Sequence, residues 1–223
     1  MTVKENLAAI QANIEDACRK TNRTKDKVQI IAVTKYVSID RAEEAVKAGV
    51  CHLGENRDDG FSQKYERIGD KATWHFIGTL QSRKVKNIID NIDYIHSLDR
   101  LSLAKEIQKR AKKKINCFVQ VNTSEEESKH GLHMNECTDF IKSLKPYTNI
   151  EIMGLMTMAP YTKDEQIIRA CFRSLKNLQE EVQALQLPFA PCTELSMGMS
   201  NDYHIAVEEG ATFVRIGSSL VGE

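Results

Sequence analysis

Short apolar runs alternate with longer amphipathic segments along this chain of 223 residues. The runs are rich in valine and isoleucine, as buried parallel strands are, and the segments between them repeat apolar residues at helical spacing. This alternation predicts repeated strand–helix units around a parallel sheet. We expect strands near residues 28–34, 51–54, 73–77, 93–97, 115–121, 150–154, 193–196 and 211–216.

The helices expected between these strands complete the pattern. Ser38 and Asp99 stand where helix N-caps belong, and Gly49 and Gly210 stand where helices should stop. A first amphipathic helix precedes the first strand. We expect helices near residues 3–21, 39–48, 57–67, 81–91, 99–112, 134–145, 164–186 and 201–209.

Eight strands, nearly all followed by a helix, favour a closed α/β barrel, a (β/α)8 TIM barrel with an extra N-terminal helix. The alternative is an open doubly wound sheet. That fold would favour a glycine-rich turn after the first strand, where this chain has Lys35-Tyr36-Val37-Ser38. Because no linker, low-complexity tract or internal repeat interrupts the pattern, we predict a single domain over residues 1–223.

The charge balance argues against a nucleic-acid or anionic-membrane surface. Lys and Arg together count 31, as do Asp and Glu, so the net charge is zero. The basic residues of 109–114 are interpreted as a solvated helix end, and those of 83–86 (Arg83, Lys84 and Lys86) as surface residues. No apolar run reaches the roughly 18 residues of a membrane span, and no signal-peptide core is evident. We expect a cytoplasmic protein.

The cysteines predict no metal site. The six of them are scattered, without a CxxC motif or a cysteine–histidine ligand spacing. We interpret them as reduced, mostly buried thiols, which is typical of cytoplasmic proteins. They stand at positions 18, 51, 117, 137, 171 and 192.

Polar residues gather where the expected strands end. In a barrel of this type the functional side chains lie at the carboxyl ends of the strands and in the loops after them. Seven of the eight ends carry such residues, at Lys35 and in 54–57, 74–78, 120–123, 153–157, 196–200 and 215–218. The segment after strand five is expected to be a mobile loop, in which Lys129 is a second candidate amine.

Lys35 is the candidate nucleophile. It follows seven mostly apolar residues, and burial of its amine would favour the neutral form that attacks a carbonyl to make a Schiff base. The alternative is a surface lysine whose head reaches past the barrel rim into water.

Two turns in adjacent loops suit a phosphate group. Gly217 and Ser218, with Ser219, offer backbone N–H groups and hydroxyls at the position where such barrels hold phosphate. Ser200, in the neighbouring turn that also contains Met199, adds a hydroxyl. An amine opposite a phosphate site suits a phosphorylated aldehyde, for which pyridoxal 5'-phosphate (PLP) is the obvious candidate.

Arg215 is expected to point into the barrel mouth. It lies between Val214 and Ile216, so it faces the other side of the strand from them. A buried arginine needs an acceptor, either a barrel carboxylate in a structural ion pair or the pyridine nitrogen of the cofactor. Because arginine only donates, a contact with the pyridine nitrogen would keep that nitrogen unprotonated and make the ring a poor electron sink.

Two further residues complete the predicted site. Asn56 is placed to hydrogen-bond the substituents of the cofactor ring. His75 would line the pocket, or else be a hydrogen-bonded core histidine, because Trp74 and Phe76 flank it.

Taken together, these residues resemble the pyridoxal phosphate homeostasis proteins, single barrels similar to the N-terminal domain of alanine racemase. The resemblance runs in order along nearly the whole chain. It implies PLP on Lys35, a phosphate site at Ser200, Gly217 and Ser218, and Arg215 at the pyridine nitrogen. The motifs that carry it are Ala32-Val33-Thr34-Lys35, Gly54-Glu55-Asn56, Trp74-His75-Phe76-Ile77-Gly78 with Leu80-Gln81, Gly154-Leu155-Met156, Ser196-Met197-Gly198-Met199-Ser200 with Asp202, and Val214-Arg215-Ile216-Gly217.

Two small departures from the family pattern leave these residues intact. Arg83 stands where the family often has asparagine, and the tail after Ser219 is short.

The resemblance favours a PLP carrier over an enzyme. Racemisation needs two bases, and in alanine racemases the second is a tyrosine from a C-terminal β domain of a partner subunit. Only the short tail 217–223 follows the last expected strand, so we expect no such domain, no catalytic residue, and PLP binding, buffering or delivery with little turnover. The implied partners are PLP and, transiently, PLP-dependent apoenzymes, for a monomer or weak dimer.

Two alternatives stay open. One is a slow or narrow PLP-dependent amino acid racemase that uses Lys35 with an acid such as Tyr36 or His204. The other is a barrel that binds a different phosphorylated metabolite without a covalent adduct.

Overall fold

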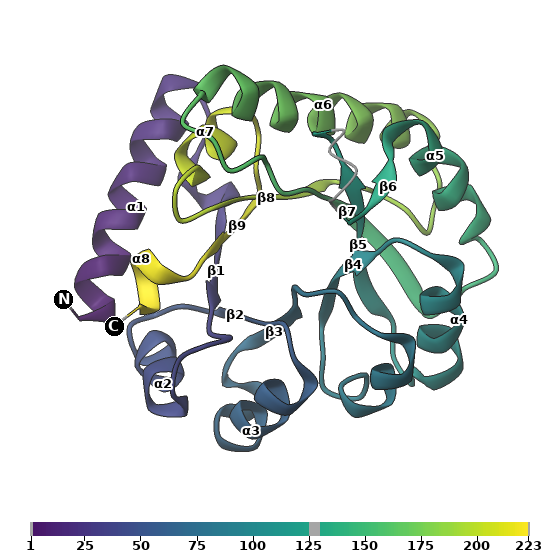
Figure 1. The fold of residues 1–223 in the computed structure, drawn as a ribbon, viewed down its shortest axis with the longest axis horizontal. Coiled ribbons are helices and arrows are strands. Elements are labelled where there is room, and N and C mark those ends of the chain that lie inside the picture. Colours follow the sequence, from purple (N-terminus) through teal and green to yellow (C-terminus); the bar gives the residue numbers. More distant parts are fainter. Residues whose placement is uncertain (1, 125–129, 223) are drawn as a thin grey trace.

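Eight parallel strands close into a ring in the computed structural model, which describes residues 2–124 and 130–222 (Figure 1). Each strand pairs with the next along the chain, and the ring closes where β9 pairs with β1. The predicted TIM barrel is confirmed. Its strands are β1 (Gln29–Val33), β2 (His52–Glu55), β3 (Thr73–Phe76), β4 (Tyr94–Leu98), β5 (Ile115–Asn122), β7 (Ile150–Met156), β8 (Glu194–Met199) and β9 (Phe213–Ile216).

The helices lie outside this ring (Figure 1). They are α1 (Val3–Lys20), α2 (Ile39–Lys47), α3 (Asp58–Ile68), α4 (Leu101–Arg110), α5 (Met134–Ser143), α6 (Glu165–Ala184), α7 (Tyr203–Glu208) and α8 (Ser218–Val221). Short 3-10 turns η1 (Lys25–Lys27), η2 (Gly69–Lys71) and η3 (Ser82–Asn87) join some of the elements. A two-residue strand, β6 (Leu132–His133), extends β5 beside the ring and was not predicted.

Three of the four predicted helix boundaries are confirmed. The Ser38 hydroxyl accepts from the Arg41 backbone N–H at 3.1 Å and caps α2. Gly49 and Gly210 follow helix ends with φ of +103° and +109°, a conformation that glycine adopts without strain. The prediction for Asp99 is wrong: α4 starts one residue later, and the Asp99 carboxylate instead pairs with Arg100.

The helix predicted over 81–91 is also wrong in type. The structure has the 3-10 turn η3 followed by further turns, which bury Val85, Ile88 and Ile89 against the barrel. The apolar spacing is the same in both cases, because a tight 3-10 turn also brings residues three apart onto one side.

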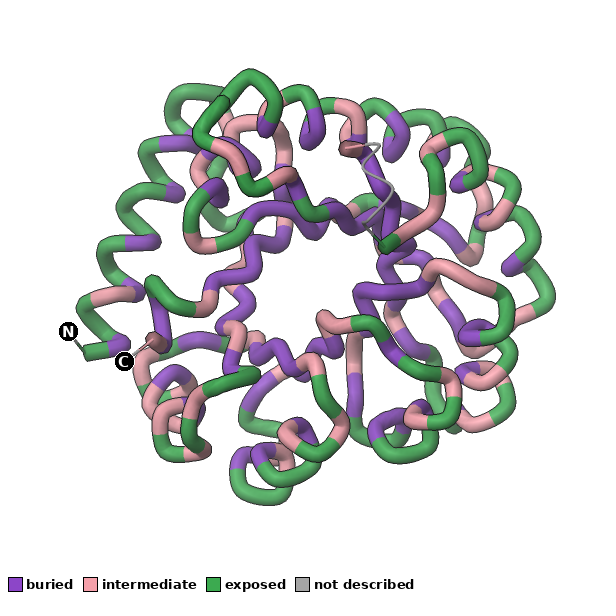
Figure 2. The backbone as a smooth tube through the Cα atoms, in the orientation of Figure 1, coloured by how far each residue is buried: buried purple, intermediate pink, exposed green. Residues whose placement is uncertain are grey.

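Two apolar cores follow from the alternation of side chains along each strand. The larger one lies between the strands and the helices, whose outer surfaces are exposed (Figure 2). The smaller one fills the ring and consists of Ile31, Phe118, Met156 and Phe213, with Tyr94 packed against it. The barrel interior is therefore packed with side chains, as TIM barrels are.

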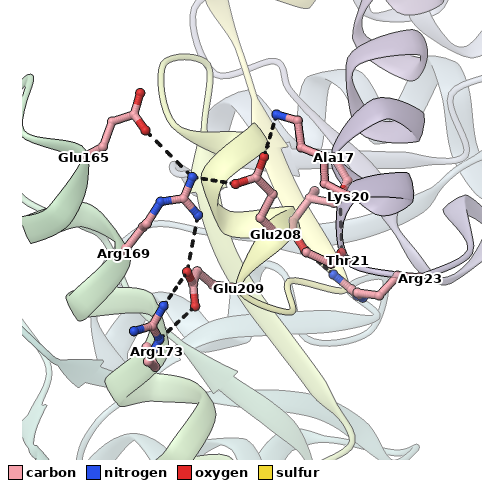
Figure 3. Close-up of polar contacts among 10 residues, drawn as sticks. Ala17, Lys20, Thr21, Arg23, Glu165, Arg169, Arg173, Glu208 and Glu209 are labelled. Carbon is pink, nitrogen blue, oxygen red and sulfur yellow. Dashed lines mark hydrogen bonds and ion pairs between the residues drawn. The ribbon is translucent and has the colours of Figure 1, made fainter.

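The first helix takes the place of a full-length eighth helix. Helix α8 is only four residues long, and α1 packs against α7, α8 and α2 on the outside of the ring (Figure 1). Its Asn13 amide donates to the Tyr203 hydroxyl at 2.8 Å. A chain of ion pairs joins the neighbouring helices: Glu208 of α7 accepts from Lys20 of α1 and from Arg169 of α6 (Figure 3).

Within residues 2–124 and 130–222, no helix combines the length and apolar character that crossing a bilayer requires.

Candidate functional site

A cavity of about 670 Å³ opens at the carboxyl ends of the strands. Its wall comes from the ends of β1, β2, β3, β5, β7, β8 and β9 and from the loops after them. The barrel geometry thus gathers residues that are far apart in the sequence, as expected for this fold. Seven of the eight predicted site residues line the cavity: Lys35, Asn56, Met199, Ser200, Arg215, Gly217 and Ser218.

Lys35 lies at the rim of this cavity rather than deep in it. The residue is exposed, and its Nζ stands 5.0 Å from the centroid of the Tyr36 ring. The prediction that the Lys35 amine is buried is therefore wrong. The reason is geometric, because Lys35 and the likewise exposed Tyr36 follow the end of β1 at the rim of the cavity.

A buried ion pair anchors the backbone just before Lys35. The Lys64 ammonium on α3 donates to the Thr34 carbonyl oxygen and to the Glu55 carboxylate, both at 2.8 Å. The Thr34 hydroxyl donates to the same carboxylate at 2.6 Å. These contacts tie the ends of β1 and β2 to α3 and fix the point from which Lys35 projects.

Arg215 is buried and points into the barrel mouth as predicted. Its guanidinium donates to the Ser196 hydroxyl at 2.6 Å and to the Thr157 carbonyl oxygen at 2.9 Å. Desolvation lowers the pKa of Arg215 to about 10, and the Asp202 carboxylate acts in the opposite direction. The group is thus still a cation at neutral pH.

The ion pair considered as an alternative role for Arg215 is not seen. In the part of the chain that the structure describes, no carboxylate lies within ion-pair distance of its guanidinium, although Asp202 is near enough to influence it. Because Arg215 also lines the cavity, it offers a cation to whatever the cavity holds.

The two predicted phosphate-binding turns meet. The Gly217 backbone N–H donates to the Ser200 hydroxyl at 3.3 Å, which places the β8 and β9 loops side by side. The β8 turn is held by Asp202, whose carboxylate accepts from the Met199 N–H at 2.6 Å. Burial raises the pKa of Asp202. Ser218 is exposed toward the cavity, where it is free to meet an anion.

Asn56 brings an unsatisfied polar atom to the wall. Its Oδ1 is buried and has no hydrogen-bond partner among the described residues. Gly78 fixes its position, since a Cβ at residue 78 would stand only 2.7 Å from the Asn56 Cβ. A buried oxygen without a donor costs free energy, so a ligand with a hydroxyl at this place would be stabilised. This orphaned oxygen fits a cofactor whose ring carries such a group.

His75 does not line the cavity. It lies below the cavity, fully buried, and hydrogen-bonds to His52 and His96 at 2.9 Å each. The structure therefore places it as a hydrogen-bonded core histidine and not as a pocket residue. Burial, together with the neighbouring imidazoles, lowers its pKa well below the ordinary value.

Several wall residues were not singled out as cofactor-binding from the sequence. The sequence predicts a role for Tyr36 only as a possible acid, and it predicts no cofactor contact for Val33, Thr79, Met158 or Asn201. The signal that would have found them is position alone, because each lies at or just after the carboxyl end of a strand.

The remaining candidate groups lie away from this site. Lys129 falls outside the described residues. Lys84 pairs with Asp58 at 2.6 Å, and Lys112, Lys113 and Lys114 each pair with an acidic residue, so these basic residues belong to paired surface clusters. Across the described ranges, no group of three or more His, Cys, Asp or Glu side chains has an arrangement that could hold a metal ion.

Known proteins with this fold and sequence point to one family. The pattern of the family described as "Alanine racemase, N-terminal domain" matches residues 6–223. A pyridoxal phosphate homeostasis protein from Aquifex aeolicus strain VF5 is 38% identical over 227 residues, which cover 100% of this chain and 99% of that protein.

Solved structures agree with this. The structure of PipY from Synechococcus elongatus PCC7942 with PLP bound superposes with a TM-score of 0.86 at 32% identity and covers 99% of this chain and 100% of that one. An alanine racemase from Clostridium difficile 630 shares the fold, with a TM-score of 0.77 at 17% identity, and this chain (98% covered) spans 56% of it. The chain belongs to the alanine racemase N-terminal domain family and, within it, to the pyridoxal phosphate homeostasis proteins.

Proposed function

We propose that this protein binds PLP covalently through Lys35 and takes part in PLP homeostasis by binding, buffering or delivering it, with little or no amino acid turnover. The observation that carries the proposal is the single cavity that gathers an amine, a buried cation and two hydroxyl-bearing turns: Lys35, Arg215, Ser200 and Ser218. PipY, with this fold, has PLP bound in its solved structure, and the relative from Aquifex aeolicus is named for PLP homeostasis.

The residues of the cavity fit this cofactor. When bound, PLP would supply an aldehyde carbon, and Lys35 is the residue whose amine could hold it through a C=N bond, with release of one water molecule. Ser200, Gly217 and Ser218 hold the phosphate, and the Gly217 N–H can exchange its 3.3 Å contact with Ser200 for a phosphate oxygen. The orphaned Asn56 oxygen accepts from a ring substituent.

Arg215 sets the electronic character of the site. An arginine donates a hydrogen bond to the pyridine nitrogen but does not give up its proton, so that nitrogen stays unprotonated. The ring then withdraws electrons weakly, which disfavours the carbanion chemistry that amino acid turnover requires. We infer that the site retains PLP rather than uses it.

Besides Lys35, the cavity wall offers one further group that could act as a base, Tyr36, and it lies beside Lys35. Among the described wall residues, Lys35, Tyr36 and Arg215 are the ionisable ones, and no carboxylate, imidazole or thiol is present. Racemisation needs a proton donor and an acceptor on opposite faces of the substrate carbon. Tyr36 lies beside Lys35, and His204 lies on α7 away from the wall, so neither supports the racemase alternative.

Absorbance titration with PLP tests the proposal. The wild-type protein should gain the visible band of lysine-bound PLP, and Lys35→Ala should not. Lys105→Ala, an exposed lysine of α4, is the matched control and should behave as wild type. A visible band that persists in Lys35→Ala, or never forms in wild type, would contradict the assignment.

A second measurement separates carrier from enzyme. The PLP-loaded protein is incubated with single amino acids in deuterium oxide, and exchange at the α-carbon is followed by NMR. We expect no exchange within minutes. Exchange within seconds would favour the racemase.

The remaining expectations concern the whole cell. We propose that the protein works in the cytoplasm as a monomer or weak dimer and meets PLP-dependent apoenzymes transiently. Of these expectations, the oligomeric state can be tested in vitro, by sedimentation of the PLP-loaded protein.

A further inference from the structure

A line of polar side chains crosses the interior of the barrel. His52 Nδ1 lies 2.9 Å from His75 Nε2, and His75 Nδ1 lies 2.9 Å from His96 Nε2. His96 Nδ1 lies 2.9 Å from the Ser196 hydroxyl, which also accepts from Arg215. One end of the line therefore reaches the candidate cofactor cavity.

The other end reaches the opposite mouth of the barrel. His52 starts β2 and lines a second cavity of about 660 Å³, which opens between the amino ends of the strands. Gln29, Glu194 and Phe213, the first residues of β1, β8 and β9, line the same cavity. The line thus connects the two faces of the molecule.

The middle of the line is buried among aromatic rings. His75 stacks on Tyr94 with ring centroids 4.5 Å apart, and His96 stacks on Phe118 at 4.4 Å. Both histidines are fully buried. In such an apolar setting each donor and acceptor must be paired with its neighbour along the line. Otherwise the line of polar side chains would make the folded protein less stable than apolar residues of the same size would.

Arg215 gives the line a direction. Its guanidinium only donates, so the Ser196 oxygen accepts from it, and the Ser196 hydrogen is left to donate to His96 Nδ1. His96 must then donate from Nε2 to His75 Nδ1, and His75 from Nε2 to His52 Nδ1. With the opposite direction, the Ser196 hydrogen would have no acceptor among the described residues.

We propose that Ser196, His96, His75 and His52 form a one-directional hydrogen-bond relay that positions the Arg215 guanidinium, with all three imidazoles neutral and protonated at Nε2. Its meaning for the cofactor rests on the proposed function. The relay does not conduct protons to the cofactor, because it ends on a guanidinium that has no lone pair to accept one. Its members are positioning residues for Arg215.

The charges around the relay agree with neutral imidazoles. Burial lowers the pKa of His75 and His96 well below the ordinary value, and the neighbouring Arg215 acts in the same direction on His96. At the open end, burial lowers the pKa of His52 while Asp93 opposes this. The other charged residues facing His52 across its cavity are Asp26, Lys27 and Glu194.

The tautomers are measurable in the protein without PLP. Long-range ¹H–¹⁵N correlation spectra report which ring nitrogen of each histidine carries the proton. We expect Nε2–H for His52, His75 and His96 near pH 7. Protonation at Nδ1 in His75 or His96, or a charged ring in either, would overturn the relay whatever PLP does.

Substitution of the donor tests the direction. In Arg215→Met the Ser196 oxygen loses its fixed donor, so we expect His96 and His75 to become mixtures of the two tautomers. Arg67→Met, an exposed arginine of α3, is the control and should leave all three unchanged. Pure Nε2–H tautomers in a folded Arg215→Met would show that Arg215 does not set the direction.

Positioning is tested with PLP. Ser196→Ala cuts the relay beside Arg215 and should weaken PLP affinity about fivefold, the cost of one hydrogen bond, and shift the visible band. His96→Leu should act alike, whereas His96→Asn keeps an acceptor near Nδ1 and should recover most of the loss. Wild-type affinity and spectrum in Ser196→Ala and His96→Leu would refute the positioning role, while failure of wild type to bind PLP would refute only the proposed function.

Discussion

At the scale of single residues, two patterns predict most of the site: the alternation of side chains along each strand, and the position of functional residues at the carboxyl ends of barrel strands. They correctly predicted that Arg215 points inward and that Lys35, Asn56, Ser200 and Ser218 share one cavity. They did not predict the exposure of Lys35, because it lies beyond the end of β1, where the alternation no longer decides which side a residue faces. Nor did they reveal the hydrogen bonds among His96, Ser196 and Arg215, since partners so far apart in sequence leave no local pattern.

Ser200→Ala is a prediction at this scale. Removal of the hydroxyl takes away one hydrogen bond to the phosphate and should weaken PLP binding by about 1 kcal/mol. Equilibrium dialysis of both proteins measures the difference. Ser102→Ala, on the exposed side of α4, is the control. Equal affinities for Ser200→Ala and wild type would remove Ser200 from the site.

At the scale of elements, the sequence predicted every barrel strand to within a few residues, because each is a short apolar run between turns. It was less successful where two structures share one pattern. The 3-10 turn η3 has the apolar spacing of an α-helix, and β6 is too short to have a pattern of its own. The Asp99 cap failed because an aspartate one position too early can pair with an arginine instead.

The ion pair between α3 and the barrel gives the prediction for this scale. Lys64 and Glu55 are almost completely buried, so Lys64→Met leaves the Glu55 carboxylate without its cation. We expect a loss of about 3–5 kcal/mol in the free energy of unfolding, measured with urea. Lys71→Met, at an exposed position just after α3, should change it by less than about 0.5 kcal/mol.

The double variant shows whether the cause is the unpaired charge. Glu55→Gln/Lys64→Met removes both charges and should recover part of the lost stability. The two single variants, Glu55→Gln and Lys64→Met, each lower the free energy of unfolding by some amount. If the double variant loses the sum of these two amounts, packing of the Lys64 stem, and not the ion pair, holds α3 in place.

At the scale of the whole molecule, the barrel encloses two buried histidines that stay neutral, and its stability should therefore depend on pH. The unfolded chain binds protons at these histidines below pH 6.5, whereas the folded protein does not, so stability is lost as the pH falls. Between pH 7 and pH 5 the loss has an upper limit of about 4 kcal/mol for the two rings, which the ordinary histidine pKa of the unfolded chain sets. Asp202, whose pKa burial raises, offsets part of this.

Urea unfolding at pH 7, 6 and 5 measures this dependence. A free energy of unfolding that stays level over this range would mean that His75 and His96 take up protons in the folded protein as readily as in the unfolded chain, contrary to the proposed relay.

The thiols supply a second prediction for the whole molecule. All six cysteines carry thiols rather than disulfides; five are buried, and Cys51 is exposed. Burial raises the pKa of Cys137 and Cys192 to about 12, so few thiolates form there. A thiol reagent should modify one cysteine quickly in the folded protein and all six in urea, and Cys51→Ser should abolish the fast phase. Fast reaction of more than one thiol would contradict the buried assignment.

The central claim is that the Lys35 amine bonds to PLP, and the mass of the borohydride-reduced protein tests it most directly. Reduction makes the C=N bond permanent, and digestion then locates the added mass on one peptide. We predict a single PLP adduct on the peptide that contains Lys35, with no adduct in Lys35→Ala. An adduct on any other lysine, or an unmodified protein after saturation with PLP, would contradict the account.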